Sequence, residues 1–480
     1  MKLKYIFITV VGPLILNSCI DELDVSQPSY ITSQSMWVDE SDAVAAVNGI
    51  YSNLRSALSS NYINWGDYRT GLFSQGIISS YATLNYTITE NSGFVDWTSI
   101  YTTINTCNLV LKHTPSISFK NNEDKNKVLA NAYFVRAFCY YYIARIWGDA
   151  PILTTGFESD EQNELFPTRQ PTDMVYSQVE KDLEEAVKLM PAGLESRKKA
   201  SLGSINMLQA DYYLWMAKTQ SKGNEYLDKA DAAIDKVLSN NKFSLSDSYE
   251  SIFSDEENNE IIFSVNFQRD EFEGGFPSDY LIPLQYILDN DIIENPVKIG
   301  SHQQWICLTQ DYQDFIYSVP NDNRATTNIM VYTDSINNST YRWINKYPGE
   351  WTSNTRFFTS DIVIYRSAEA ILFKAEIQNA LGNKANSINQ LNIIAKRAYG
   401  VDNYYPDTLT KAEVDNAIID ERLKEFVAEG KIWWDYIRFG VVFDRVPQLQ
   451  GRENDENILL WPVSVTSMNT NPNIKQTPGL

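Results

Sequence analysis

The sequence predicts a mainly α-helical protein, in which a scaffold of helices carries an inserted loop-rich region with short strands. Apolar residues recur at three- and four-residue steps over most of residues 39–240 and again over about 361–445, a period typical of helices with one buried face. Between these stretches, at about 241–360, the period stops, and Gly, Pro and aromatic residues become frequent. A hydrophobic content of 43% with 21% charged residues fits a globular protein.

The first predicted helix carries one buried stripe, formed by Val44, Val47, Tyr51, Leu54 and Leu58. Further helices are predicted at about 97–147 (two helices, separated by the polar stretch 120–127), 173–190, 204–218, 225–239, 361–381, 384–397 and 410–430. Short helices in succession favour an irregular tetratricopeptide-like array of helix pairs, with a plain helical bundle as the alternative.

Three segments do not follow the helical period. Residues 60–95 are rich in Gly, Ser, Asn, Thr and Tyr and predict a long irregular excursion. Residues 261–265, Ile-Ile-Phe-Ser-Val, predict a buried strand that opens the inserted region. The last segment, 461–480, is rich in Pro and Asn and is predicted to be irregular.

The N-terminus has the pattern of a bacterial lipoprotein signal. Lys2 and Lys4 precede an apolar run from Tyr5 to Leu16, which is too short to cross a bilayer as a helix. Cys19 follows a small residue, and a thiol at the first mature position is the site that such signals acylate. We therefore predict a signal peptide at 1–18, an extended leader at 19–38 and one soluble domain at 39–480; an ordinary signal peptide with a chance cysteine is the alternative.

Charge and composition exclude several classes of function. A net charge of −21 argues against nucleic acid and against anionic lipid surfaces, which bind clustered Lys and Arg. With two histidines and no phosphate loop, nucleophile elbow or His-Glu-x-x-His motif, the chain offers no sign of a catalytic triad, a metal site or a cofactor. Cys107, Cys139 and Cys307 are expected to be buried free thiols, with a Cys107–Cys139 disulfide as the alternative.

Two sets of side chains are candidates for chemistry. Glu421, Glu425 and Glu429 share one face of a predicted helix, a spacing more typical of structural ion pairs than of a catalytic carboxylate pair. Aromatic residues in irregular segments suggest instead a platform on which sugar rings stack, with polar neighbours for the hydroxyl groups. The predicted binding residues are Tyr81, Tyr86, Tyr280 and Trp305 for stacking, with Asn85 and Asp67 for hydrogen bonds.

Residues 421–440 closely resemble the signature helix of the SusD/RagB family of Bacteroidetes outer-membrane lipoproteins. The shared features are Glu-Arg, Glu-Phe, Glu-Gly, an aromatic pair with Asp, and Arg-x-Gly. Other segments resemble the family in the same order along the chain: 97–108, 132–137, 148–151, 361–369 and 460–479. The match extends over nearly the whole mature chain, and Cys19 followed by Asp21 and Glu22 resembles the surface-export signal of such lipoproteins.

The resemblance implies four irregular tetratricopeptide-like helix pairs, a variable loop-rich region and no catalysis. It also implies that the protein binds a glycan at the cell surface and acts as a lid on a TonB-dependent SusC-like transporter of the outer membrane. The ligand residues of the family come from variable loops, so the resemblance does not assign them residue by residue. A peptide cargo, a helical surface glycoside hydrolase and a repeat protein without a ligand remain as alternatives.

Overall fold

The computed structural model describes residues 36–76, 81–159, 165–193, 196–283, 299–300, 304–334, 338–347, 349–351 and 356–480. The predicted signal peptide, Cys19 and almost all of the predicted leader lie outside the described residues. The protein is mainly helical, as the sequence predicts, and one large hydrophobic core runs through both groups of helices.

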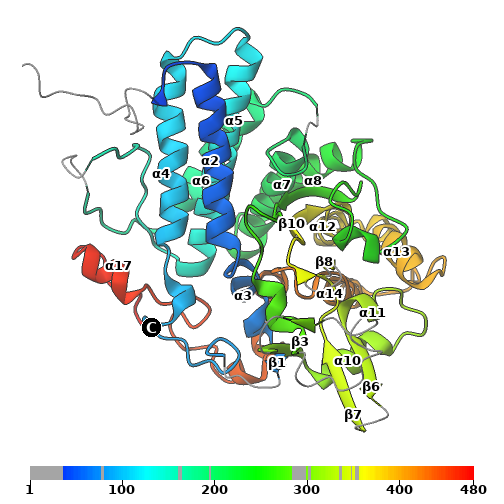
Figure 1. The fold of residues 1–480 in the computed structure, drawn as a ribbon. Coiled ribbons are helices and arrows are strands. Elements are labelled where there is room, and N and C mark those ends of the chain that lie inside the picture. Colours follow the sequence, from blue (N-terminus) through cyan, green and yellow to red (C-terminus); the bar gives the residue numbers. More distant parts are fainter. Residues whose placement is uncertain are drawn as a thin grey trace, which may run out of the picture.

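The first group of helices forms a bundle, with its long axes side by side in Figure 1. Its members are α2 (Glu40–Leu58), α4 (Thr98–His113), α5 (Asn122–Trp147) and α6 (Thr172–Leu189). Asp39 caps α2 by accepting hydrogen bonds from the backbone N–H groups of residues 41 and 42. The predicted stripe on α2 is buried except at its first residue, because the Val44 side chain is 45% exposed.

The second group packs as successive helix pairs, α7 with α8 and α12 with α13. Its members are α7 (Leu202–Thr219), α8 (Gly223–Leu238), α12 (Ser367–Ala380), α13 (Lys384–Tyr399), α14 (Lys411–Phe426) and α15 (Ile432–Phe439). The predicted capping box at Thr410 and Glu413 is present and opens α14. These pairs confirm the predicted helix-pair scaffold, and in Figure 1 they lie beside the first bundle.

A two-stranded antiparallel sheet lies among the helices. Strand β2 (Ile261–Val265) is the buried strand that the sequence predicts, and it pairs with β10 (Ile362–Arg366). The predicted helix at about 361–381 is therefore wrong over its first residues, which form β10 before α12 begins at Ser367. Every residue of both strands is buried, so the apolar run did not distinguish a strand from a buried helix.

The inserted region is built from short elements, as the sequence predicts. The strands are β1 (Phe73–Gln75) with β5 (Ile306–Leu308), β3 (Ile282–Pro283) with β4 (Ile299–Gly300), β6 (Met330–Asp334) with β7 (Ser339–Trp343), and β8 (Glu350–Trp351) with β9 (Arg356–Phe357). Its α-helices are α10 (Gln310–Tyr317) and α11 (Ala325–Asn328), and its 3-10 helices are η5 (Glu250–Phe253) and η6 (Phe276–Tyr280).

Two segments predicted to be irregular contain short helices. The excursion at 60–95 contains α3 (Tyr62–Asp67), η2 (Tyr68–Thr70), β1 and η3 (Gly93–Val95). The remaining short helices are η4 (Thr114–Ser116), α16 (Val442–Arg445), η8 (Pro447–Leu449) and, in the C-terminal segment, α17 (Val465–Thr470). All of α3 is buried, and Gly66 lies so close to Gly430 that an added Cβ would be 1.9 Å from the Gly430 carbonyl oxygen.

The three glutamates of α14 and the turn after it are buried in ion pairs. Glu425 accepts hydrogen bonds from Arg366 at 2.5 Å and Arg324 at 3.1 Å, and also pairs with Arg397. Burial would raise the pKa of Glu425, but the three guanidinium groups outweigh it and hold the pKa well below its ordinary value.

The neighbours of Glu425 are paired in the same way. Glu421 lies 2.8 Å from Arg324, and Glu429 lies 2.8 Å from Lys346. Burial lowers the pKa of Lys346 to about 8, although Glu429 opposes that shift. The interpretation of this helix face as a structural ion cluster is thus confirmed, and the segment that carries the family resemblance belongs to the core.

Cys107, Cys139 and Cys307 are free and buried. The expected buried thiols are confirmed, and the alternative Cys107–Cys139 disulfide is not formed.

Candidate functional site

Trp305 is the most exposed of the predicted stacking residues, and its backbone is fixed on both sides. Its carbonyl accepts a hydrogen bond from Gly76 N at 2.9 Å, which continues the β1–β5 ladder, and its N–H donates to the Asp279 carbonyl at 2.8 Å. The side chain is 36% exposed. Gly76 allows this approach, because an added Cβ would lie 2.2 Å from the Gln304 carbonyl oxygen. The sheet therefore presents a tryptophan ring from a rigid support.

Tyr81 lies next to Trp305, as the prediction of a shared platform requires. The two ring centroids are 6.2 Å apart, with the rings nearly perpendicular at 84°. Tyr81 also stacks on Phe94 at 5.2 Å and meets the edge of Tyr68 at 5.7 Å, so three aromatic neighbours fix its orientation. Tyr81, Phe94 and Trp305 are each only partly buried. We call these three rings the aromatic surface.

A carboxylate that the sequence analysis did not select lies beside the aromatic surface. Asp279 is half-buried on η6, and its backbone carbonyl receives the Trp305 N–H. Burial raises the pKa of Tyr81, and the nearby Asp279 carboxylate raises it further. A carboxylate beside partly exposed rings is a hydrogen-bond acceptor for sugar hydroxyl groups. Its position next to Tyr280 in an aromatic-rich segment is the only signal that the sequence offered.

Asn85 and Tyr86 lie in the turn that follows Tyr81. The Asn85 N–H donates to the Tyr81 carbonyl at 3.2 Å, and its side chain is exposed near the aromatic surface. Tyr86 has a positive φ of 55° and a half-buried ring, and its hydroxyl donates to the Arg69 carbonyl. Tyr86 thus anchors the turn against Arg69, whose guanidinium carbon lies 5.7 Å from the ring centroid.

Two of the predicted binding residues belong to the core instead. The side chain of Tyr280 is fully buried, and its hydroxyl shares a 2.7 Å hydrogen bond with Tyr68. Asp67 is also fully buried and accepts backbone N–H groups of Gly430, Lys431 and Ile432 at 2.8–3.1 Å. Burial raises the pKa of Asp67 to about 7, while these hydrogen bonds oppose the shift. Both residues are therefore corrected from ligand contacts to structural roles.

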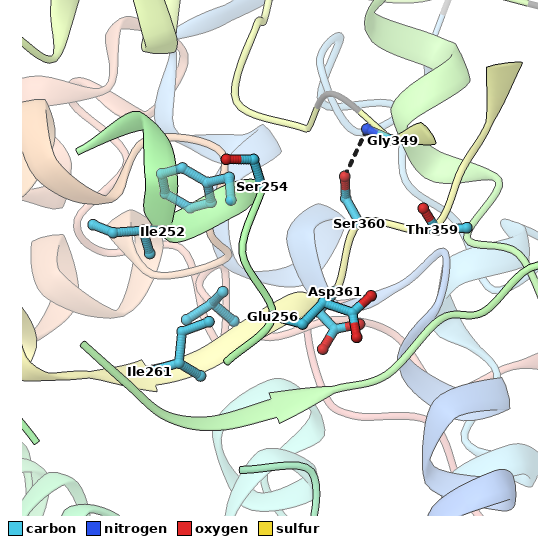
Figure 2. A pocket seen from close by; sticks show the side chains of 10 residues that line it. Ile252, Ser254, Glu256, Ile261, Gly349, Thr359, Ser360 and Asp361 are labelled. Atoms are coloured by element: carbon cyan, nitrogen blue, oxygen red, sulfur yellow. Dashed lines mark hydrogen bonds between the residues drawn. The ribbon is translucent and has the colours of Figure 1, made fainter. Parts of the chain in front are cut away.

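A small cavity beside the end of β10 is too small for a sugar ring. Figure 2 shows it lined by Ser254, Glu256, Ser360 and Asp361, with the Gly349 N–H donating to Ser360 Oγ. Its volume of about 50 Å³ has room for a few water molecules. Asp361 already accepts hydrogen bonds from the β2 end, and burial raises its pKa to about 6.

Metal and membrane elements were sought within the same described ranges. There, no group of three or more His, Cys, Asp or Glu side chains is placed to hold a metal ion. In those ranges, too, every helix is either too short or too polar to cross a bilayer.

Comparison with known proteins identifies the scaffold. A family model described as starch-binding and associating with the outer membrane matches residues 22–206, and the SusD family model matches residues 309–480. Together these matches extend over both groups of helices. The chain belongs to the SusD/RagB family.

Individual relatives agree with this assignment over the whole length. SusD-like protein P38 of Formosa agariphila is 24% identical, over 98% of this chain and 97% of its own. The starch-binding protein SusD of Bacteroides thetaiotaomicron is 29% identical over 32% of this chain and 28% of its own. A SusD-superfamily crystal structure from Bacteroides vulgatus has a TM-score of 0.80 and 25% identity, covering 92% of this chain and all of that one. The resemblance seen in the sequence is confirmed.

Proposed function

We propose that this SusD-family protein captures an oligosaccharide or polysaccharide at the cell surface and passes it to a TonB-dependent, SusC-like transporter of the outer membrane. The aromatic surface is the observation that carries the proposal. A sugar ring presents C–H groups that pack on exposed aromatic faces, and its hydroxyl groups need polar neighbours. Trp305 and Tyr81 supply the faces, and Asp279 and Asn85 supply the polar groups.

The family assignment supports a carbohydrate ligand. The model that matches residues 22–206 is described as starch-binding, and one relative is named a starch-binding protein. The rigid backbone around Trp305 lowers the ordering cost of binding, while a small area of contact limits the affinity. We therefore expect modest affinity and no catalytic step.

Calorimetry with a panel of neutral oligosaccharides tests this proposal. Trp305→Ala should reduce binding of the best ligand at least about tenfold, because aromatic contact residues at binding sites commonly contribute more than about 1 kcal/mol. Trp37→Ala is the matched control, since Trp37 stacks on His113 just before α2, at the end of the bundle remote from β1 in Figure 1. Equal affinity of the Trp305→Ala and wild-type proteins would contradict the proposal, as would a panel in which only peptides bind.

Release of reducing ends from the same ligands tests the absence of catalysis. Unchanged oligosaccharide after long incubation is the expected result. Cleavage would contradict it and would favour a hydrolase, for which no carboxylate of the α14 ion cluster is free.

The predicted lipid anchor at Cys19 would hold the soluble domain at the transporter. The family model's description, which includes association with the outer membrane, supports this location. A Cys19→Ala protein is expected to fold and to bind glycan in solution, yet to fail to support growth on the cognate glycan. Normal growth with that variant would show that the anchor is dispensable for uptake.

A further inference from the structure

A second cleft, separate from the aromatic surface, lies against α2. It has a volume of about 370 Å³ and lies between α2, residues 198–199 and the end of β2 with the turn that follows. This volume falls within the range of about 300–1,000 Å³ that is usual for small-molecule sites. The residues of the aromatic surface do not line it.

The lining of the cleft is basic, although the protein is strongly acidic. The net charge of the chain is −21, yet Arg55, Lys198 and Lys199 line this cleft together with one carboxylate, Glu271. Opposed charges concentrated in a concave site focus the local field, so the cleft favours anions over the rest of the surface.

Arg55 offers a donor that the described protein does not use. Its Nη2 donates to Glu271 at 2.6 Å and its Nη1 to the Asn266 carbonyl at 3.3 Å. Within the described residues its Nε is buried and has no hydrogen-bond partner. The guanidinium carbon lies 5.3 Å from the Phe272 ring centroid, which keeps the group in place. Arg55 can therefore accept a further oxygen ligand without moving.

The carboxylates that now pair with these cations are replaceable. Glu271 is 56% exposed and lies on a tight turn in which Asp270 has a φ of 65°. Lys198 pairs with Glu256, whose side chain is 42% exposed. Ion pairs with exposed partners contribute little to stability, so an incoming oxyanion can take the place of Glu271 at small cost.

The remaining walls suit a sugar ring. Leu54 and Val265 give an apolar side, and the amides of Asn48, Asn266 and Gln268 lie around it. An apolar wall with a few polar groups and a cation is the usual composition of a site for a small polar ligand.

We propose that this cleft binds a sugar unit that carries an oxyanion, either a carboxylate or a sulfate ester, with Arg55 and Lys198 as its charge partners. The proposal names an acidic class of ligand and therefore rests on the proposed glycan-binding function. Glu271 acts as an internal competitor for Arg55. Binding at this cleft holds the acidic unit of a chain whose other units reach the aromatic surface or the solvent.

Matched ligands test the charge requirement. Calorimetry compares trigalacturonic acid with its fully methyl-esterified form, which keeps the sugars and removes the charges. Galactose 6-sulfate and galactose form the second pair. The acid should bind at least about tenfold more tightly than its ester, as expected for a charge-assisted contact in a cleft. Preference for the sulfate pair alone assigns the oxyanion to sulfate, and preference in both pairs assigns it to either; no preference in either pair would overturn the proposal.

Variants test the location. Arg55→Gln and Lys198→Met should each lower the affinity for the preferred acidic ligand about tenfold, whereas Glu271→Gln should raise it by removing the competitor. Lys188→Met, at an exposed i,i+3 pair with Glu185 on α6, is the control for overall charge and should have no effect. A simple loss of structure would not increase the affinity of Glu271→Gln. Acid-selective binding that none of the three cleft variants changes would overturn the site.

The same measurements separate this proposal from the proposed function. Trp305→Ala should leave trigalacturonate binding at the cleft within about twofold of wild type, because Trp305 does not line it. If Trp305→Ala fails to affect neutral glycans while the cleft variants behave as stated, the aromatic surface is wrong and the cleft stands. If neutral glycans depend on Trp305 but acidic ligands show no preference, the cleft is wrong and the proposed function stands.

Discussion

Replacing Glu425 by Gln should destabilise the protein severely, although the two side chains have nearly the same shape. Glu425 is fully buried and accepts hydrogen bonds from Arg324, Arg366 and Arg397. The amide of Gln carries no charge, and its NH₂ group would face guanidinium donors. The substitution therefore leaves positive charge uncompensated in the core.

The magnitude follows from the partners that each arginine keeps. Arg324 retains Asp322 at 2.8 Å, and Arg366 retains Glu429 at 2.9 Å. Arg397 loses its nearest carboxylate and keeps only Glu260, at 3.6 Å. Removing one partner from a buried ion pair costs about 3–5 kcal/mol. That is a large part of the roughly 5–15 kcal/mol by which native proteins are stable.

Denaturant unfolding followed by circular dichroism measures the effect. Asp402→Asn is the matched control, because it also neutralises one carboxylate, but in a pair with Lys396 in which the side chains are 71% and 65% exposed. Such a pair contributes less than about 1 kcal/mol. If Glu425→Gln lowers the unfolding free energy no more than Asp402→Asn does, the reasoning that the signature segment is a structural ion cluster is refuted.

Three further predictions concern the core. Gly66→Ala should cost at least about 3 kcal/mol in unfolding free energy, since its Cβ would meet the Gly430 backbone, whereas Gly49→Ala, with open space, should not destabilise. Two cationic partners lower the pKa of Glu376 to about 2 from its ordinary 4.5 despite burial, so its contribution of about 3 kcal/mol is present above pH 4.5 and lost as the pH falls toward 2; Glu376→Gln should flatten acid unfolding there. Cys107 and Cys139 should resist a thiol reagent until the protein unfolds, because burial raises both pKa values; reaction in the native state would contradict this.

Helical periodicity predicted most of the scaffold because the helices bury one face each. It failed where burial is complete, since β10 has no polar face and its run of apolar residues continues into α12. It also failed at α3, where a short helix is formed by residues with little helical period and is held by the Gly66–Gly430 contact. That contact joins segments far apart in the chain and leaves no local signal.

The candidate site shows the same limit. The sequence could nominate Tyr81 and Trp305 as aromatic residues in irregular segments, but only the fold brings their rings together. It could not show that Tyr280 and Asp67 are fully buried, since a ring or a carboxylate in a loop can point either way. Asp279 was missed because its value lies in its position beside Tyr81 and not in a motif.

A crystal structure of the protein with its best-bound neutral oligosaccharide tests the central claim most directly. We expect a sugar ring in contact with the Trp305 and Tyr81 rings, with hydroxyl groups directed to Asp279. A ligand bound elsewhere, with the aromatic surface unoccupied, would contradict the account.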